Sequence, residues 1–327
     1  MTALGRRPVP LAVALTAVLA ACGRPASRAA PAREAAAPAP LVAGDTAYLV
    51  VADTLVPEAI ARAGPRLFLG SIAQRRVYLA DATAGTSQAR PWSPELGGPV
   101  LGLEVDSVRG WLWAAVMRPA GRGAGAIVAL RLADGTVARR VALPPGAHLP
   151  NDLALRADGV LFVTDTDGGG VWSLAPGDTA LRLAVPAADG WREPNGIALG
   201  PDGVLYVAYA EGIRAGVPES EPLAPLRGPA TLELGGIDGL YRAADGLVGI
   251  QRVGDVDQVV HVRLARDQRT VSRVTVLERR HPAYTAPTTG LVTGDTLLYL
   301  ANSQIPGWKQ RAAVGDTTVV LRVILAD

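Results

Sequence analysis

Two stretches of the chain decide its fold: PNDLALRADGVLFVTD at residues 150–165 and PNGIALGPDGVLYVAY at residues 194–209. In each, apolar and polar residues alternate on both sides of an Asp-Gly pair, which is the pattern of two antiparallel strands joined by a tight turn. The stretches match position for position although their starts lie 44 residues apart. The chain therefore contains an internal repeat whose unit begins with a β-hairpin.

The repeat extends over most of the chain. Six segments follow one template, in which an opening residue precedes an apolar strand, a turn follows, and a second apolar strand ends the hairpin. Their starts are 43 to 51 residues apart, and further apolar stretches follow most of the hairpins. Four strands in a repeat of about 45 residues is the period of a β-propeller blade. The six copies open at Glu58, Leu101, Asn151, Asn195, Asp238 and Thr289.

We therefore predict an all-β fold for residues 45–327, a six-bladed β-propeller with four antiparallel strands per blade. An apolar strand at residues 47–51 precedes the first copy. This strand can complete the last blade, which would close the ring and remove the open sheet edge. An open solenoid is the alternative, and the near-uniform period together with the early strand favours the closed ring.

The amino terminus has the features of a lipoprotein signal peptide over residues 1–22. Arg6 and Arg7 precede an apolar run that is too short to span a bilayer and that ends in Leu-Ala-Ala-Cys. Cys22 is the only cysteine, so the chain can form no internal disulfide. We expect Cys22 to be lipidated and to become the mature first residue. Because Gly23 follows it, we expect a cell-envelope lipoprotein of the outer membrane, facing the periplasm.

Residues 23–44 are rich in Ala, Pro and Arg without apolar periodicity, which predicts a disordered tether between the lipid and the propeller. Removing residues 1–22 takes away two arginines and no acids, so 32 basic residues become 30 against 30 acidic ones. A nearly neutral chain lacks the basic surface of a nucleic-acid-binding protein. We expect no nucleic-acid partner, membrane contact through the lipid alone, and a monomer in preference to an oligomer.

The residues that open the six inner strands are expected to meet at one mouth of the central channel. Two are carboxylates, Glu58 and Asp238, and two are amides, Asn151 and Asn195. Four oxygen donors with two negative charges suit a hard divalent cation, with Ca²⁺ the expected ion and Zn²⁺ or Mn²⁺ the alternatives. Asn and Asp before Gly are also common in turns. Here, however, they open strands, and the hairpins have Asp-Gly turns of their own. We therefore predict a metal site at these four residues.

A second set of polar residues is expected near the same mouth, because the strand that pairs with each inner strand returns to it. His148 lies in the loop just before Asn151 and could reach the mouth as well. The residues expected to contact a substrate are Asn151, His148, Asp165, Tyr209, Gln251 and Asn302.

The segments VPEAIA, LPNDLALRADG, EPNGIALGPDG and GIDGL, which carry the four predicted metal ligands, resemble a known family. They are similar to the gluconolactonase and regucalcin-like (senescence marker protein-type) six-bladed propellers and their paraoxonase relatives, over residues 57 to about 304. The resemblance implies a divalent metal held by these residues and a small-molecule substrate such as a lactone or sugar derivative. The implied function is metal-dependent hydrolysis of lactones or small esters, with Asp238 as the catalytic base.

The chain departs from this family at two places. Paraoxonases carry a catalytic histidine where this chain has Leu101, so a mechanism based on histidine is not expected at that position. Ala59 follows Glu58 where relatives commonly have Gly. A second function stays open, that of a non-catalytic propeller that binds a ligand or a protein and uses the metal structurally, because the fold alone does not decide whether the chain is an enzyme.

Overall fold

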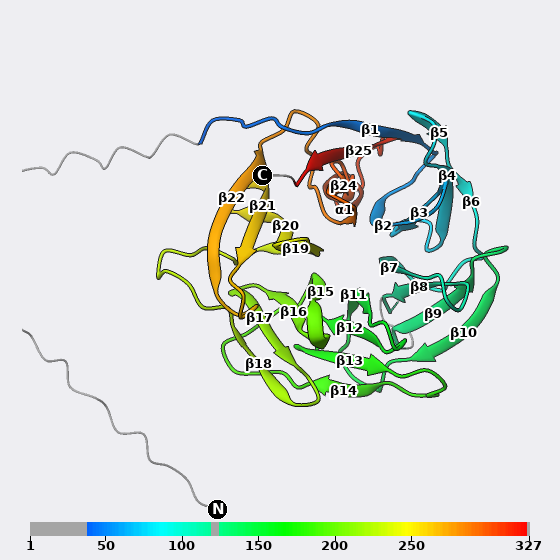
Figure 1. The fold of residues 1–327 in the computed structure, drawn as a ribbon. Coiled ribbons are helices and arrows are strands. Elements are labelled where there is room, and N and C mark those ends of the chain that lie inside the picture. Colours follow the sequence, from blue (N-terminus) through cyan, green and yellow to red (C-terminus); the bar gives the residue numbers. More distant parts are fainter. Residues whose placement is uncertain (1–37, 119–123, 326–327) are drawn as a thin grey trace, which may run out of the picture. The chain divides into compact units, whose positions relative to one another are not determined.

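The chain forms a ring of six antiparallel sheets around a central channel (Figure 1). The computed structural model describes residues 38–118 and 124–325. Each sheet has four strands that follow one another from the channel outwards, and the sixth has an additional short strand at its outer edge. This confirms the predicted six-bladed β-propeller with four antiparallel strands per blade.

The blades follow the order of the sequence. Blade one contains β2 (Pro57–Ala63), β3 (Arg66–Ser71), β4 (Val77–Asp81) and β6 (Arg90–Pro91). Blade two contains β7 (Val100–Asp106), β8 (Trp111–Val116), β9 (Ala126–Arg131) and β10 (Val137–Ala142). Blade three contains β11 (Pro150–Leu155), β12 (Leu161–Asp165), β13 (Gly170–Leu174) and β14 (Arg182–Val185).

Blade four contains β15 (Ile197–Leu199), β16 (Leu205–Tyr209), β17 (Gly212–Val217) and β18 (Glu221–Pro225). Blade five contains β19 (Ile237–Ala243), β20 (Gly246–Val253), β21 (Val256–Leu264) and β22 (Val271–Arg279). Blade six contains β23 (Gly290–Thr293), β24 (Thr296–Leu300), β25 (Thr317–Ile324) and β1 (Asp45–Val51), with β5 (Thr86–Gln88) at its edge. A 3₁₀ turn, η1 (Pro201–Gly203), and one short α-helix, α1 (Ile305–Lys309), lie in the loops.

The amino-terminal strand β1 closes the ring, as predicted. It pairs antiparallel with β25, the last described strand, and in parallel with β5, which follows β4 of blade one in the sequence. The guanidinium of Arg322 on β25 bonds both carboxylate oxygens of Asp45 on β1 at 2.7 Å. The last blade is therefore assembled from both ends of the propeller, which leaves no unpaired edge between blades six and one.

The hydrophobic core lies between neighbouring blades. Side chains on a strand alternate between its two faces, so every blade presents an apolar face to each neighbour. Six clusters of buried residues each join two adjacent blades. Phe68 of blade one and Leu112 of blade two, both fully buried, meet in one of them. Burial of a side chain of this size stabilises the fold by about 1.5–3 kcal/mol.

Glycine is required where the inner strands approach one another most closely. A Cβ atom at Gly102 would lie 2.3 Å from the backbone oxygen of Asn151, and one at Gly196 would lie 2.5 Å from the backbone oxygen of Asp238. Neighbouring inner strands therefore come together without an intervening side chain. This explains why a small residue follows the opening residue in the repeat.

The compact unit begins at Ala39, earlier than the predicted boundary at Asp45. Residues 39–44, the end of the predicted tether, are hydrogen-bonded to β22: the N–H groups of Ala43 and Gly44 both donate to the Glu278 carboxylate. Cys22, the predicted signal peptide and residues 23–37 of the predicted tether lie outside the described residues. No helix in the described part of the chain has the length and apolarity needed to cross a membrane.

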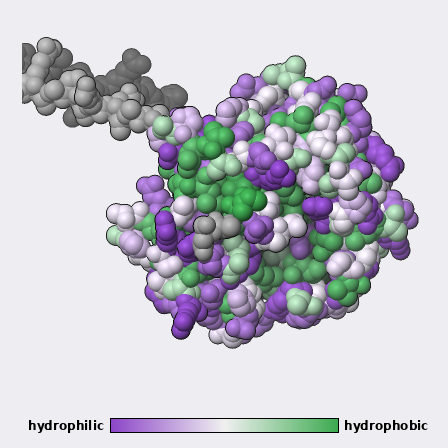
Figure 2. Space-filling model, turned by 45° about the horizontal axis from the view of Figure 1, so that its top comes forward, coloured by the Kyte–Doolittle hydropathy of each residue, from purple (hydrophilic) through white to green (hydrophobic). Residues whose placement is uncertain are grey.

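The surface mixes polar and apolar residues. On the face shown in Figure 2, hydrophilic residues are spread between smaller groups of hydrophobic ones. Few large apolar side chains are exposed, among them Val42 at 53% and Ile324 at 52%.

Candidate functional site at the channel mouth

A cavity of about 590 Å³ lies at the end of the channel where the inner strands begin. Glu58, Asn195 and Asp238, three of the four predicted metal ligands, line it together. They open the inner strands of blades one, four and five, so the cavity gathers residues that are far apart in the sequence. This confirms that the opening residues of several repeats converge at one mouth.

Glu58 brings an unpaired carboxylate oxygen to this cavity. Its Oε2 atom is buried and has no hydrogen-bond partner in the described structure. Burial raises the pKa of the Glu58 carboxyl well above its usual range, the nearby charge of Asp238 raises it further, and the charge of Lys309 acts in the opposite direction. A buried carboxyl without a partner is costly unless it keeps a proton or binds a cation.

Asp238 lies beside Glu58 and is held by Asn195, whose Nδ2 donates to Asp238 Oδ1 over 2.8 Å. Burial raises the pKa of Asp238 to about 6, while the hydrogen bond from Asn195 and the charges of Arg252 and Lys309 lower it. Asn195 itself is fixed by its backbone, because its N–H donates to Ala208 O over 2.9 Å just before β15 begins. The mouth therefore contains a positioned carboxyl that is largely ionised at neutral pH.

Asn151 is placed differently from the other three predicted ligands. Its Nδ2 donates to Thr166 Oγ1 over 3.0 Å, and the Thr166 hydroxyl donates to Pro194 O over 2.8 Å. Asn151 is not among the residues that line the mouth cavity, although Thr166 is. The structure thus brings Glu58, Asn195 and Asp238 together and ties Asn151 to the neighbouring loop.

The donor set at the mouth is chemically suited to a hard cation. Two carboxylates and one amide provide oxygen ligands, and Ca²⁺ readily takes such ligands together with water. Within the described ranges, no group of three or more His, Cys, Asp or Glu side chains is arranged to hold a metal ion. A metal at this mouth would therefore depend on Asn195 and water in addition to the two carboxylates. This set suits Zn²⁺ less well, because Zn²⁺ favours nitrogen and sulfur ligands.

Two of the predicted substrate-contacting residues line the mouth cavity, Tyr209 and Gln251. Tyr209 is buried and packs edge-on against Trp191, with ring centres 5.3 Å apart. Gln251 donates from Nε2 to Glu233 O and Gly235 O and accepts a hydrogen bond from Gln258. Gln251 therefore fixes the loop before β19, and Tyr209 is the more available of the two.

The remaining predicted contact residues, His148, Asp165 and Asn302, do not line the cavity. Asp165 is 1% exposed and accepts hydrogen bonds from Leu149 N, Gly168 N and Trp172 Nε1, with His148 Nδ1 2.5 Å from its Oδ2. Asn302 donates to Thr317 O and accepts from Val319 N. Asp165 and Asn302 thus satisfy backbone groups of the loops, and His148 pairs with Asp165.

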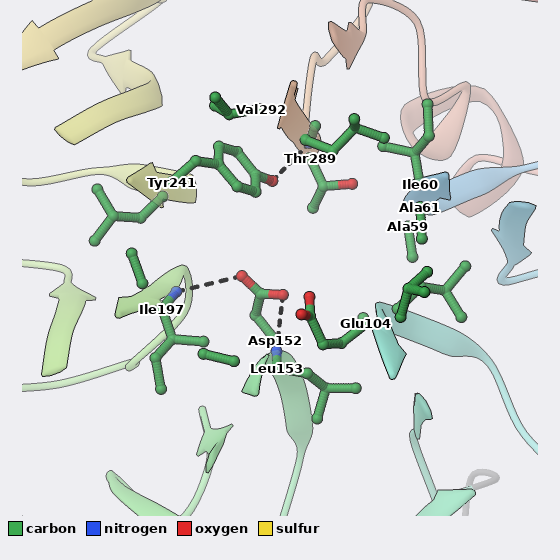
Figure 3. Close-up of a pocket in the computed structure, with 18 of the residues that line it drawn as sticks. Ala59, Ile60, Ala61, Glu104, Asp152, Leu153, Ile197, Tyr241, Thr289 and Val292 are labelled. Carbon is green, nitrogen blue, oxygen red and sulfur yellow. Dashed lines mark hydrogen bonds between the residues drawn. The ribbon is translucent and has the colours of Figure 1, made fainter. Parts of the chain in front are cut away.

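The channel below the mouth holds acidic residues that the sequence analysis missed. A second cavity of about 350 Å³ is lined by Asp152, Glu104 and Tyr241, and Figure 3 shows the two carboxyl groups facing each other. Asp152 accepts hydrogen bonds from Leu153 N and Ile197 N. Burial raises its pKa to about 7. Burial, aided by the charge of Asp152, raises the pKa of Glu104 to about 8.

The mouth also has a cationic side that sequence reasoning missed. Lys309, at the end of α1, and Arg252, on β20, both line the mouth cavity. They come from a loop of blade six and from the second strand of blade five, and neither residue opens an inner strand. One signal was available, since Lys309 is the only lysine of the chain.

The fold and the mouth define a six-bladed β-propeller with an acidic, amide-containing pocket on its axis. No protein-family model matches the chain, and no curated protein matches it. Solved structures with the same fold include a protein described as an oxidoreductase (glucose dehydrogenase) from Thermus thermophilus, 17% identical with a TM-score of 0.60, covering 86% of this chain and 100% of that one.

Two further solved structures share the fold. Virginiamycin B lyase from Staphylococcus aureus is 15% identical with a TM-score of 0.58, covering 83% of this chain and 96% of its own. A protein described as a gluconolactonase is 17% identical with a TM-score of 0.53, covering 87% of this chain and 92% of its own. At these identities the likeness concerns the fold. It agrees with the gluconolactonase part of the resemblance at that level, while the regucalcin and paraoxonase part stays a prediction.

Proposed function

We propose that the mouth is the active site of a divalent-metal-dependent hydrolase that acts on lactones or small esters. The observation that carries this proposal is the buried, unpartnered Oε2 of Glu58 beside Asp238 and Asn195 in a cavity that a small molecule fits. Such an oxygen is the group that a cation would satisfy. The shared fold with a protein described as a gluconolactonase supports the same assignment.

The residues of the mouth have separate roles in this proposal. Glu58, Asn195 and Asp238 would hold the cation, which when bound supplies a Lewis acid for the ester carbonyl. Asn195 fixes one oxygen of Asp238, leaving the other to take a proton from an attacking water. The water oxygen bonds to the carbonyl carbon, the ester C–O bond breaks, and the proton passes to the departing alkoxide. A lactone gives a hydroxy acid, and a small open-chain ester gives an acid and an alcohol.

The ionisation of Asp238 suits the role of a base. With its pKa raised to about 6, the carboxyl is mostly ionised at neutral pH and is a stronger base than an exposed aspartate. Glu58 has a buried carboxylate oxygen without a hydrogen-bond partner, and it serves as a ligand in this scheme. We place the enzyme in the cell envelope, anchored through Cys22, on the strength of the amino-terminal sequence.

The test is a panel of lactones and small esters offered to the chain with Cys22→Ser, with Ca²⁺, Mn²⁺, Zn²⁺ or a chelator. We expect hydrolysis that requires a metal, stops on chelation, and falls at least about 100-fold in Asp238→Ala. Asp53→Ala removes an exposed aspartate away from the cavity and is the matched control. Metal-independent hydrolysis, or full activity of Asp238→Ala, would refute the proposal.

A second candidate function rests on a separate observation, the four acidic side chains along one channel. Glu58 and Asp238 at the mouth and Glu104 and Asp152 below it would be relieved by a cation whether or not chemistry follows. A non-catalytic binding propeller with a structural metal would bind the ion tightly, melt at a higher temperature with it, and hydrolyse nothing on the panel. If Asn195→Ala and Asp238→Ala both leave metal affinity unchanged, neither function stands.

A further inference from the structure

Lys309 is unusual in both sequence and position. It is the only lysine among 32 basic residues other than histidine, all the others being arginine. It ends α1 in the loop between β24 and β25 and lines the same cavity as Glu58 and Asp238. The only lysine of the chain therefore lines the same mouth as the proposed metal ligands.

The two cations that line the mouth differ in their partners. Arg252 is engaged by Asp257, with guanidinium-to-carboxylate distances of 2.6 and 2.9 Å. Lys309 has no hydrogen bond or ion pair to any side chain in the described part of the protein. Its backbone is nevertheless fixed, because Trp308 N donates to Gln304 O and Gln310 N donates to Pro306 O around the turn. Lys309 is thus an exposed cation on a hydrogen-bonded turn, with its charge available.

An ammonium suits this position better than a guanidinium. Arginine presents a planar fork that matches a carboxylate, and in this chain Arg252 and Arg322 each bond both oxygens of an aspartate. An arginine at position 309 could bond both oxygens of Glu58 or Asp238, because these carboxylates line the same cavity. The ammonium is a compact charge with rotatable donors, which leaves those carboxylates free for a cation.

The charges of the mouth then select the ligand. A divalent cation would neutralise Glu58 and Asp238, and the positive charge of Lys309 would remain in the same cavity. A small ligand between them is favoured if it carries a negative group. The proposed reaction creates such a group, because opening a lactone gives a hydroxy acid whose carboxylate is ionised at neutral pH.

We propose that Lys309 binds the carboxylate of a hydroxy acid, the ring-opened form of a lactone, at the channel mouth. The inference rests on the proposed hydrolase function and adds the chemical class of its ligand. Lys309 is a binding residue in this scheme, and the ammonium donates hydrogen bonds to the carboxylate oxygens. A charge-assisted hydrogen bond of this kind contributes about 1.5–3 kcal/mol, or roughly 10- to 150-fold in affinity.

The single lysine permits a direct test on the full chain with Cys22→Ser. Acetylation of Lys309 by an amine-reactive ester is followed by mass spectrometry. The same reaction on Lys309→Arg, which has no lysine, measures the acetylation of the terminal amine alone. At fixed free Ca²⁺, gluconate should slow the acetylation of Lys309. Gluconamide, with the same hydroxyl groups and no charge, should not. Equal protection by both compounds, or protection by neither, would overturn the proposal.

Calorimetry gives a second measurement that does not depend on turnover. Lys309→Met should weaken gluconate binding at least about 10-fold and leave gluconamide binding unchanged. Arg311→Met removes an exposed cation two residues away that does not line the cavity, and it should bind gluconate as the parent does. Parental gluconate affinity in Lys309→Met would overturn the proposal.

The two proposals fail in different ways. Selective protection by gluconate without hydrolysis of any lactone would support the carboxylate site and refute the hydrolase. Metal-dependent hydrolysis without selective protection would support the hydrolase and refute the role of Lys309.

Discussion

Replacing Glu104 by glutamine should make the propeller more stable at alkaline pH. Glu104 faces Asp152 inside the channel (Figure 3), where burial and the charge of Asp152 raise its pKa to about 8. Glutamine has nearly the same shape and no charge to desolvate. The substitution therefore removes the cost of ionising this position while keeping the packing of β7.

The sign and size of the effect follow from proton linkage. Between pH 4.5, the ordinary pKa of glutamate, and pH 8, the folded protein keeps a proton that the unfolded chain has released. Unfolding then releases protons, so the free energy of unfolding falls as the pH rises through this window. A pKa shift of this size corresponds to a change of at most about 5 kcal/mol in the free energy of unfolding, at about 1.4 kcal/mol per pKa unit. The effective dielectric constant of protein interiors is higher than that of a dry medium, so we expect roughly 2 kcal/mol.

The assay is urea and thermal denaturation of the parent and Glu104→Gln at pH 5 and pH 8.5. The advantage of the variant should be small at pH 5 and grow to roughly 2 kcal/mol at pH 8.5, a rise of roughly 4–8 °C in melting temperature. Glu233→Gln, which changes an exposed glutamate whose side chain makes no hydrogen bond, should follow the parent at both pH values. A variant that is less stable than the parent at pH 8.5 would show that Glu104 is ionised and paired, and would refute the reasoning.

Three further substitutions test the ring. Gly196→Ala should lose at least about 2 kcal/mol in urea denaturation, because its Cβ would lie 2.5 Å from the backbone of blade five, whereas Gly85→Ala, in open space, should not. Val50→Asp should lower the melting temperature by several degrees or prevent folding, since Val50 is fully buried on the closing strand; Val42→Asp, at an exposed position, should be neutral. Glu278→Ala should speed amide hydrogen exchange at residues 41–44, because the Glu278 carboxylate accepts the Ala43 and Gly44 N–H groups; unchanged exchange would contradict this contact.

The architecture was predictable because a propeller repeats itself. The hairpins at 150–165 and 194–209 state the blade pattern clearly, and once the copies were aligned, the residues that open each inner strand had to converge. Glu58, Asn195 and Asp238 do so. Asn151 opens its strand in the same way, yet a hydrogen bond to Thr166 ties it to the adjacent loop. The repeat predicts where each inner strand begins. The hydrogen-bond partners of the opening residue decide which way its side chain points.

Two parts of the site could not be predicted from the repeat. Lys309 belongs to a loop of blade six that has no counterpart in the other repeats. Aligning the repeats therefore does not predict its position. Asp152 and Glu104 are visible in the sequence, but their meeting inside the channel depends on the angle between blades two and three. Asp165 and Gln251 were expected at the mouth as ligand contacts because polar residues end the second strands. Gln251 does line the mouth cavity, but its side chain is bonded to loop carbonyls and to Gln258. Asp165 does not line it and is bonded to loop N–H groups and to the side chains of Trp172 and His148.

The closing strand also sets the order in which the propeller can be completed. Asp45 and Arg322, which pair across β1 and β25, are 277 residues apart in the chain. At a synthesis rate of about 5–20 residues per second, β1 would wait roughly 14 to 55 s for its partner strand. Until then its edge is available to other chains. Truncation into β1 and truncation into β25 would therefore damage the same blade.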